Sequence, residues 1–210
     1  RLMFAGAVAL ATVVIGFVIA FRGPWIAPFA LAVGVWVMAG AVSELALRTR
    51  FSPTAIGDSL RRLTNLPGSV IGTVMAHFGV GMMVVGIVGT SAWQSESILV
   101  MKPGERASIA GYELAFRGTQ ELKGPNYRET MAHFTVTRGG APVTELSPSK
   151  RLYIAPPQPT SEAGIHVSWR GDLYAVIGDP QGSGGGFAVR LYFHPLVRFI
   201  WIGAVVMFIG

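Results

Sequence analysis

The sequence contains no cysteine and few charged residues. The absence of Cys among its 210 residues excludes disulfide bonds, thiolate metal sites and thiol catalysis for this section of chain. Charged residues make up 13% of the total, about half of the roughly 25% that is usual in soluble domains. A composition this poor in charge, with 51% hydrophobic residues, is typical of a membrane protein.

The basic residues are in excess, but they are not evenly distributed. The formal net charge is +6, yet residues 94–190 contain ten basic and nine acidic side chains and so carry a net charge of only +1. The other basic residues flank apolar segments, where such side chains set membrane topology; these are Arg1, Arg22, Arg48, Arg50, Arg61, Arg62 and Arg198. No basic patch remains on the polar part, which argues against a nucleic-acid partner.

Long apolar runs divide the chain and predict its fold class. A bilayer-spanning helix needs about 20 apolar residues. On that basis residues 1–47 are predicted to form two transmembrane helices, 48–67 a cytoplasmic amphipathic loop, and 68–93 a third transmembrane helix. Residues 194–210 are predicted to begin a further, truncated span, so the chain is expected to be a section of a longer protein. We therefore predict a membrane α-helical protein with an inserted extramembrane all-β domain, sandwich-like or barrel-like, at residues 94–193.

The evidence for the β-domain is a series of short alternating segments separated by Gly and Pro. The predicted strands are 97–101, 107–116, 130–137, 151–154, 164–169, 172–178 and 187–193. Tyr153 to Gly164 contains three prolines and is predicted to be an irregular connection. Gly182 to Gly186 does not open a helical pattern, so it is predicted to be a loop and not a phosphate-binding turn.

His77 is the candidate functional residue. It is the only ionisable side chain between Arg62 and Glu96, and an ionisable residue inside a membrane helix marks a functional site by default. Three interpretations remain open from the residues alone: a hydrogen bond that holds neighbouring helices together, a proton relay, or an axial ligand to a haem or metal. Nearby small residues would leave room for a flat macrocycle, although glycine also permits close helix packing; these are Gly79, Gly81 and Gly86.

The other three histidines are expected to have no catalytic role. His133 is predicted to face outward on a strand whose apolar side chains face inward, namely Ala132, Phe134 and Val136. His166 is likewise predicted to face outward beside Ser168, with three apolar residues inward: Ile165, Val167 and Trp169. His194, before Pro195, is expected at the membrane interface. No nucleophile–base pair is evident, and Glu44 is expected to pair with Arg48 four residues on.

Several phrases of the sequence are similar to those of one known family. They are MAHFGVGMMVVGIVG (75–89), MKPGERASIAGYELAFRG (101–118), KGPNYRETMAHFTVTRGG (123–140), RGDLYAVIGD (170–179) and FAVRLYFHPLVRFIWIGAVVMFIG (187–210). In this order they resemble the C-terminal part of CcmF, the haem lyase subunit of the bacterial cytochrome c maturation system. The resemblance covers roughly residues 68–210.

The resemblance implies a cofactor, partners and a location. It implies a haem b in the membrane, with His77 as one axial ligand of the iron and the second ligand outside this section. It implies support for the covalent attachment of haem to apocytochrome c, with catalytic residues unknown. The implied partners are a haem chaperone, apocytochrome c, other maturation subunits, the lipid bilayer and quinol. The implied location is the bacterial inner membrane, with the β-domain in the periplasm.

One feature of that family has no counterpart here. The family joins haem to protein at a second site, which uses a Trp-rich external segment and two external histidines. No Trp-rich run occurs in this section, so neither His133 nor His166 is assigned to that role. Two alternatives without haem remain: a membrane transporter, or a structural scaffold with an external β-domain.

Overall fold

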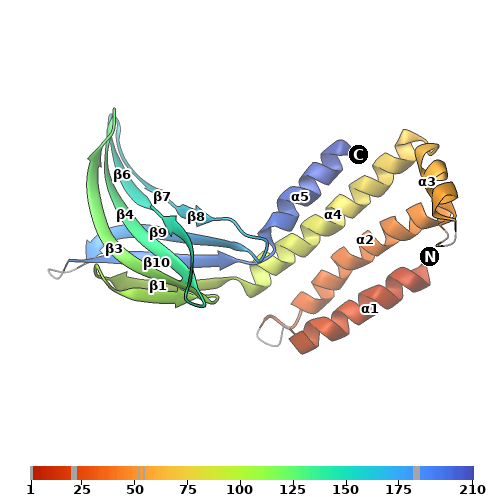
Figure 1. Ribbon diagram of the computed structural model, residues 1–210, viewed down its shortest axis with the longest axis horizontal. Coiled ribbons are helices and arrows are strands. Elements are labelled where there is room, and N and C mark those ends of the chain that lie inside the picture. The colour runs from red at the N-terminus through yellow and green to blue at the C-terminus, as the bar shows by residue number, and fades with distance from the viewer. Residues whose placement is uncertain (1, 20–22, 52, 54, 182–184) are drawn as a thin grey trace. The chain divides into compact units, whose positions relative to one another are not determined.

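The computed structural model describes residues 2–19, 23–51, 53, 55–181 and 185–210 (Figure 1). The chain divides into two compact units. Residues 1–93 and 195–210 form one, which we call the helical unit, and Gln94–His194 form the other, which we call the β-unit. The chain is therefore a set of helices with an all-β domain inserted before the last helix.

The helical unit is built from apolar helices. The helices are α1 (Leu2–Ile19), α2 (Ala27–Thr49), α3 (Ile56–Thr64), α4 (Gly68–Trp93) and α5 (Val197–Ile209). Helices α2 and α4, of 23 and 26 residues, are long and apolar enough to cross a membrane. At 1.5 Å per residue they extend about 35 and 39 Å. Many of their large apolar side chains are exposed, Trp36 and Ile87 among them, as expected for a surface that faces lipid.

Glycines bring these helices into backbone contact. A Cβ atom on Gly34 of α2 would lie 2.9 Å from the carbonyl oxygen of Gly81 on α4. A Cβ on Gly79 of α4 would lie 2.6 Å from the carbonyl oxygen of Gly203 on α5. These separations are too short for any side chain, so α4 packs against α2 and α5 through glycine, as small residues allow in membrane helices.

Ten strands make up the β-unit in the part of the chain that is described. They are β1 (Ser95–Met101), β2 (Arg106–Ile109), β3 (Tyr112–Lys123), β4 (Tyr127–Arg138), β5 (Ala141–Leu146), β6 (Ser149–Ile154), β7 (Pro157–Glu162), β8 (Gly164–His166), β9 (Asp172–Gln181) and β10 (Gly186–His194). One antiparallel sheet has the order β1-β10-β9-β8. The other has the order β2-β3-β4-β6-β7, with β5 paired to β4.

The two sheets enclose an apolar core. Phe116 and Phe134 stack with ring centroids 5.0 Å apart, and Leu173, Ile177 and Leu191 are fully buried with them. Ala132, Phe134 and Val136 are buried as predicted, so the side of β4 that faces the core is confirmed. The predicted fold class, membrane-type helices with an inserted all-β sandwich, is confirmed.

Three predictions for the strands were wrong. The strand expected at 164–169 is β8, which ends at His166. The single strand expected at 107–116 is two strands, because Ala110 and Gly111 both have positive φ angles and form a tight turn between β2 and β3. The stretch from Tyr153 to Gly164, expected to be irregular, contains β7, which pairs with β6 from Ile154↔Pro157 to Ser149↔Glu162. Its prolines are tolerated because β7 is an edge strand. The loop predicted at Gly182 to Gly186 lies largely outside the described residues.

Candidate functional site

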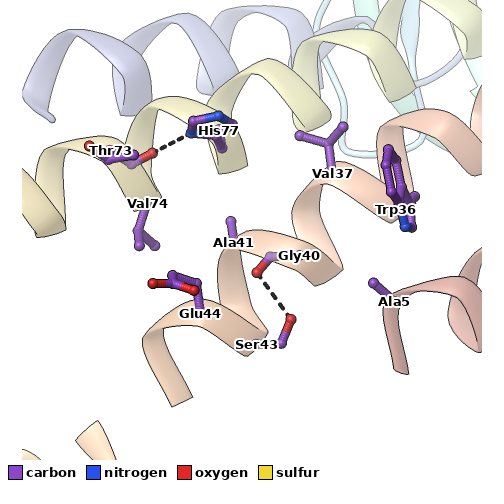
Figure 2. Close-up of a pocket in the computed structure, with 10 residues that line it drawn as sticks. All are labelled: Ala5, Trp36, Val37, Gly40, Ala41, Ser43, Glu44, Thr73, Val74 and His77. Carbon is purple, nitrogen blue, oxygen red and sulfur yellow. Dashed lines mark hydrogen bonds between the residues drawn. The ribbon is translucent and has the colours of Figure 1, made fainter. Parts of the chain in front are cut away.

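His77 lies near the middle of α4 and is held by its own helix. Its Nδ1 atom is 2.7 Å from the carbonyl oxygen of Thr73, one turn earlier (Figure 2). A carbonyl can only accept a hydrogen bond, so Nδ1 must donate and carry the proton. In the neutral ring this leaves the lone pair on Nε2. Many metal-binding histidines are arranged in the same way, with the other ring N–H donated to a backbone carbonyl.

A cavity of about 500 Å³ opens beside His77 within the helical unit. Figure 2 shows its lining side chains, which come from α1, α2 and α4. The lining residues are Ala5, Trp36, Val37, Gly40, Ala41, Ser43, Glu44, Thr73, Val74 and His77. Most of this wall is apolar, and the volume falls within the usual range of 300–1,000 Å³ for a small-molecule site.

The hydroxyl groups of the cavity already have hydrogen-bond partners. Ser43 donates to the carbonyl oxygen of Ala39 at 2.7 Å, and Thr73 donates to that of Ser69 at 2.8 Å. Glu44 accepts a hydrogen bond of 2.5 Å from Arg48, which confirms the expected i,i+4 pair. The imidazole of His77 is therefore the cavity group whose chemistry is best suited to binding a metal centre.

The glycines around His77 act in helix packing. Gly81 contacts Gly34 and Met38 of α2, while Gly79 contacts Gly203 and Met207 of α5. Gly86 likewise packs against Ile200. Of the two roles that the sequence allowed for these glycines, the structure therefore shows close helix contact.

His166 was assigned to the wrong face. Its ring makes an edge-on contact with the buried Tyr112, at 6.0 Å between centroids, and Ser168 lies 3.5 Å from the Tyr112 hydroxyl. Ile165, Val167 and Trp169 are instead 47%, 49% and 74% exposed. The alternation failed because β8 ends at His166, so Val167 and Trp169 lie beyond the strand, while Tyr112 offers His166 an aromatic partner.

The remaining histidines also lie in the β-unit. His133 pairs with Gly118 across β3 and β4 and is half-buried. His194 ends β10 and lies against Tyr174 and Tyr192, with ring centroids 5.2 and 6.0 Å apart. Burial, followed by the charge of Asp172, raises the pKa of the Tyr174 hydroxyl. The described residues contain no group of three or more His, Asp or Glu side chains that could hold a metal ion.

The sequence patterns do not predict the buried carboxylate of the β-unit. Glu129 of β4 is 5% exposed and accepts hydrogen bonds from Ser149 at 2.5 Å and from Arg151 at 2.9 Å. Arg151 also lies over the ring of Tyr127 at 4.8 Å. The Ser149 hydrogen bond and then Arg151 lower the pKa of Glu129, against the opposing effect of burial. The network depends on register between β4 and β6, which no local pattern reveals.

Comparison with known protein families identifies the β-unit. The family described as the CcmF C-terminal beta-sandwich matches residues 92–195. The chain corresponds to the C-terminal part of CcmF. A CcmF-type relative, the cytochrome c-type biogenesis protein CycK of Rhizobium meliloti, is 43% identical over all 210 residues. CcmF of Escherichia coli is 36% identical over 180 residues, which is 86% of this chain.

The chain spans between a quarter and a third of the length of these two relatives. It covers 31% of the Rhizobium CycK protein and 26% of Escherichia coli CcmF. A solved structure titled cytochrome c heme lyase CcmF matches the whole chain over 33% of its own length, with a TM-score of 0.77 and 19% identity. That likeness shows that the fold is shared. These relatives are named as cytochrome c-type biogenesis proteins, and the solved structure is titled a heme lyase.

Proposed function

We propose that this chain forms one side of a transmembrane haem b site in a haem lyase that matures cytochrome c. His77 would supply one axial ligand to the iron through Nε2. The observation that carries the proposal is the hydrogen bond from His77 Nδ1 to the Thr73 carbonyl, beside an apolar cavity. The second axial ligand would come from the part of the protein outside this section.

The residues present fit a haem. A neutral imidazole with a fixed tautomer is the usual protein ligand of haem iron. The cavity walls are mostly apolar, and an apolar environment around a haem helps to set its reduction potential. The competing role for His77, a hydrogen bond between helices, is less well supported because the bond that His77 makes stays within α4.

The reaction that this site would support is the covalent attachment of haem to apocytochrome c. When bound, the haem would supply one-electron redox chemistry, for which quinol is the proposed electron donor. His77 would hold the haem through Nε2, and side chains of α1, α2 and α4 would line its pocket. A haem chaperone, apocytochrome c and other maturation subunits would be the protein partners.

The basic residues favour one membrane orientation. Arg48, Arg50, Arg61 and Arg62 lie in or beside the α2–α4 connection, which the positive-inside rule places in the cytoplasm. Helix α4 would then cross outward, and the β-unit would lie in the periplasm of a bacterial inner membrane. The domain limits predicted from the sequence belong to this same proposal.

Visible spectroscopy of the full-length protein tests the haem ligand. We expect the dithionite-reduced protein to show a sharp b-type α-band that is lost or broadened in His77→Ala. The control His133→Ala changes a half-buried histidine of the β-unit and should leave the band unchanged. Equal spectra for His77→Ala and the unaltered protein would move the ligand elsewhere, and absence of haem from both would remove this chemistry from the proposal.

A further inference from the structure

Helix α3 is amphipathic, and most of its apolar stripe is exposed in the described part of the chain. Ile56 and Leu60 lie four residues apart on one side of the helix and are 54% and 56% exposed. Leu63 completes the stripe and is half-buried. The buried residue of α3 is instead Ser59, whose hydroxyl donates to the carbonyl oxygen of Ala55. The apolar side of α3 therefore remains available to a partner outside these helices.

The chain around α3 is strongly basic. Residues 48–67 contain four arginines and one acidic residue, Asp58, which lies in the first turn of α3. Arg48 is already paired with Glu44. The other three arginines are exposed; they are Arg50, Arg61 and Arg62. An excess of positive charge therefore faces solvent beside the apolar stripe of α3.

Two helices long enough to span a membrane keep α3 close to the bilayer surface. Helix α2 ends at Thr49, six residues before α3, and α4 begins at Gly68, three residues after it (Figure 1). The shorter link spans at most about 14 Å. Helix α4 extends about 39 Å, more than the roughly 30 Å of the hydrocarbon core, so its ends reach the headgroup layer. The last turn of α3, which carries Arg61 and Arg62, therefore lies beside the lipid headgroups.

We propose that α3 binds anionic phospholipid at the membrane surface. Ile56 and Leu60 would insert among the acyl chains, while the lipid phosphates would bind the exposed arginines of this connection, Arg50, Arg61 and Arg62. Interfacial helices combine an apolar face with basic residues in this way, and basic clusters next to a membrane-spanning helix attract anionic lipids. The inference requires neither haem at His77 nor a particular orientation of the chain in the membrane.

Charge complementarity favours lipid over a segment of polypeptide as the occupant. A protein segment that covered Ile56 and Leu60 would need acidic groups for the neighbouring arginines as well as apolar side chains. An anionic phospholipid supplies an acyl chain and a phosphate in one molecule, at the depth where α3 lies. The relatives of this chain are longer than it is, so a segment of the same protein is the occupant that the experiment must distinguish from lipid.

Photo-crosslinking from α3 tests the lipid preference. p-Benzoylphenylalanine replaces Leu60 in the full-length protein, which is placed in nanodiscs of equal parts phosphatidylglycerol and phosphatidylcholine. We expect lipid adducts, with at least about threefold more phosphatidylglycerol than phosphatidylcholine. Salt at about 1 M should bring this ratio close to one, because salt screens the arginine charges. The salt measurement needs no change of charge in α3, so it does not depend on whether a variant folds.

Variants that remove charge assign the preference to particular residues. In the same crosslinking protein, Arg61→Gln with Arg62→Gln should lower the ratio of phosphatidylglycerol to phosphatidylcholine adducts to about one. Arg106→Gln with Arg117→Gln removes the same charge from exposed positions of the β-unit and should leave the ratio unchanged. Equal labelling of the two lipids before any arginine is changed would overturn the inference. So would adducts with another segment of the protein in place of lipid, or a lipid preference that survives in the α3 variant.

Discussion

At the scale of single residues, Glu129 shows how one buried charge is accommodated. Ser149 and Arg151 donate to its carboxylate, and both bonds are strongest when it is ionised. The lowered pKa of Glu129 means that this contribution to stability is complete above the pKa of an unfolded glutamate. The contribution is lost as pH falls through the lower pKa of the folded state. The stabilisation from Glu129 should therefore decline only below about pH 4.5.

Replacement of Glu129 tests this linkage. We expect Glu129→Gln to lower the free energy of unfolding at pH 7 by about 1–3 kcal/mol, because Ser149 and Arg151 lose a buried charged acceptor and Arg151 keeps its longer contact with Glu162. The variant should also lose part of the decline in stability below about pH 4.5. Circular dichroism during chemical unfolding at several pH values measures both effects. Glu113→Gln breaks an exposed ion pair with Arg106 and should change stability little. An unchanged acid profile in Glu129→Gln would contradict the prediction.

Individual residues also show where sequence reasoning works and where it fails. The phase of β4 was predicted correctly because Ala132, Phe134 and Val136 share the side that faces the core. The same rule failed for His166, because Ile165 is exposed on β8 and the strand ends at His166, before Val167 and Trp169. Alternation gives the period of a strand, and the choice of face depends on contacts with distant residues such as Tyr112.

At the scale of elements, glycine decides how the membrane helices meet. Gly34 and Gly81 allow α2 and α4 to touch along their backbones. We expect Gly34→Val to reduce the stability of the full-length protein by about 1–3 kcal/mol, because the added side chain forces the helices apart. Gly6→Val is the control, since a Cβ on Gly6 has no atom within 4 Å among the contacts that are described. Thermal unfolding followed by size-exclusion chromatography compares them, and equal loss in both variants would contradict this account.

The elements were predicted with different success for physical reasons. The apolar runs predicted helices in the regions of α1, α2, α4 and α5, because lipid selects for composition and length. The strand at 107–116 was not divided correctly, since the turn depends on the positive φ angles of Ala110 and Gly111. Strand β7 was missed because its prolines indicate a loop, and only its place at a sheet edge makes them acceptable.

At the scale of the whole molecule, the chain combines two units with different sources of stability. The helical unit buries few of its apolar residues. In the most apolar stretch of each helix, only 17% of the residues of α2 and 28% of those of α4 are buried. Within this unit the helices are held together by close backbone contacts at glycines. The β-unit instead has a core of its own, built around Phe116, Phe134, Leu173 and Leu191. The sequence already predicted a separate domain at residues 94–193, but the residues that form its core across two sheets required the structure.

This division predicts that residues 94–194 fold without the helices. The excised β-unit should be soluble in water, show the circular dichroism of a β-protein and unfold in one cooperative transition, as expected for a domain of this size. Phe116→Ala should destabilise it by about 3–5 kcal/mol, because Phe116 is fully buried against Phe134. Thr119→Ala on the same strand is the control and should cost far less, since Thr119 is exposed. If the excised unit were unfolded while the full-length protein is stable, the core of the β-unit would depend on the membrane section, and the insertion would not be an independent domain.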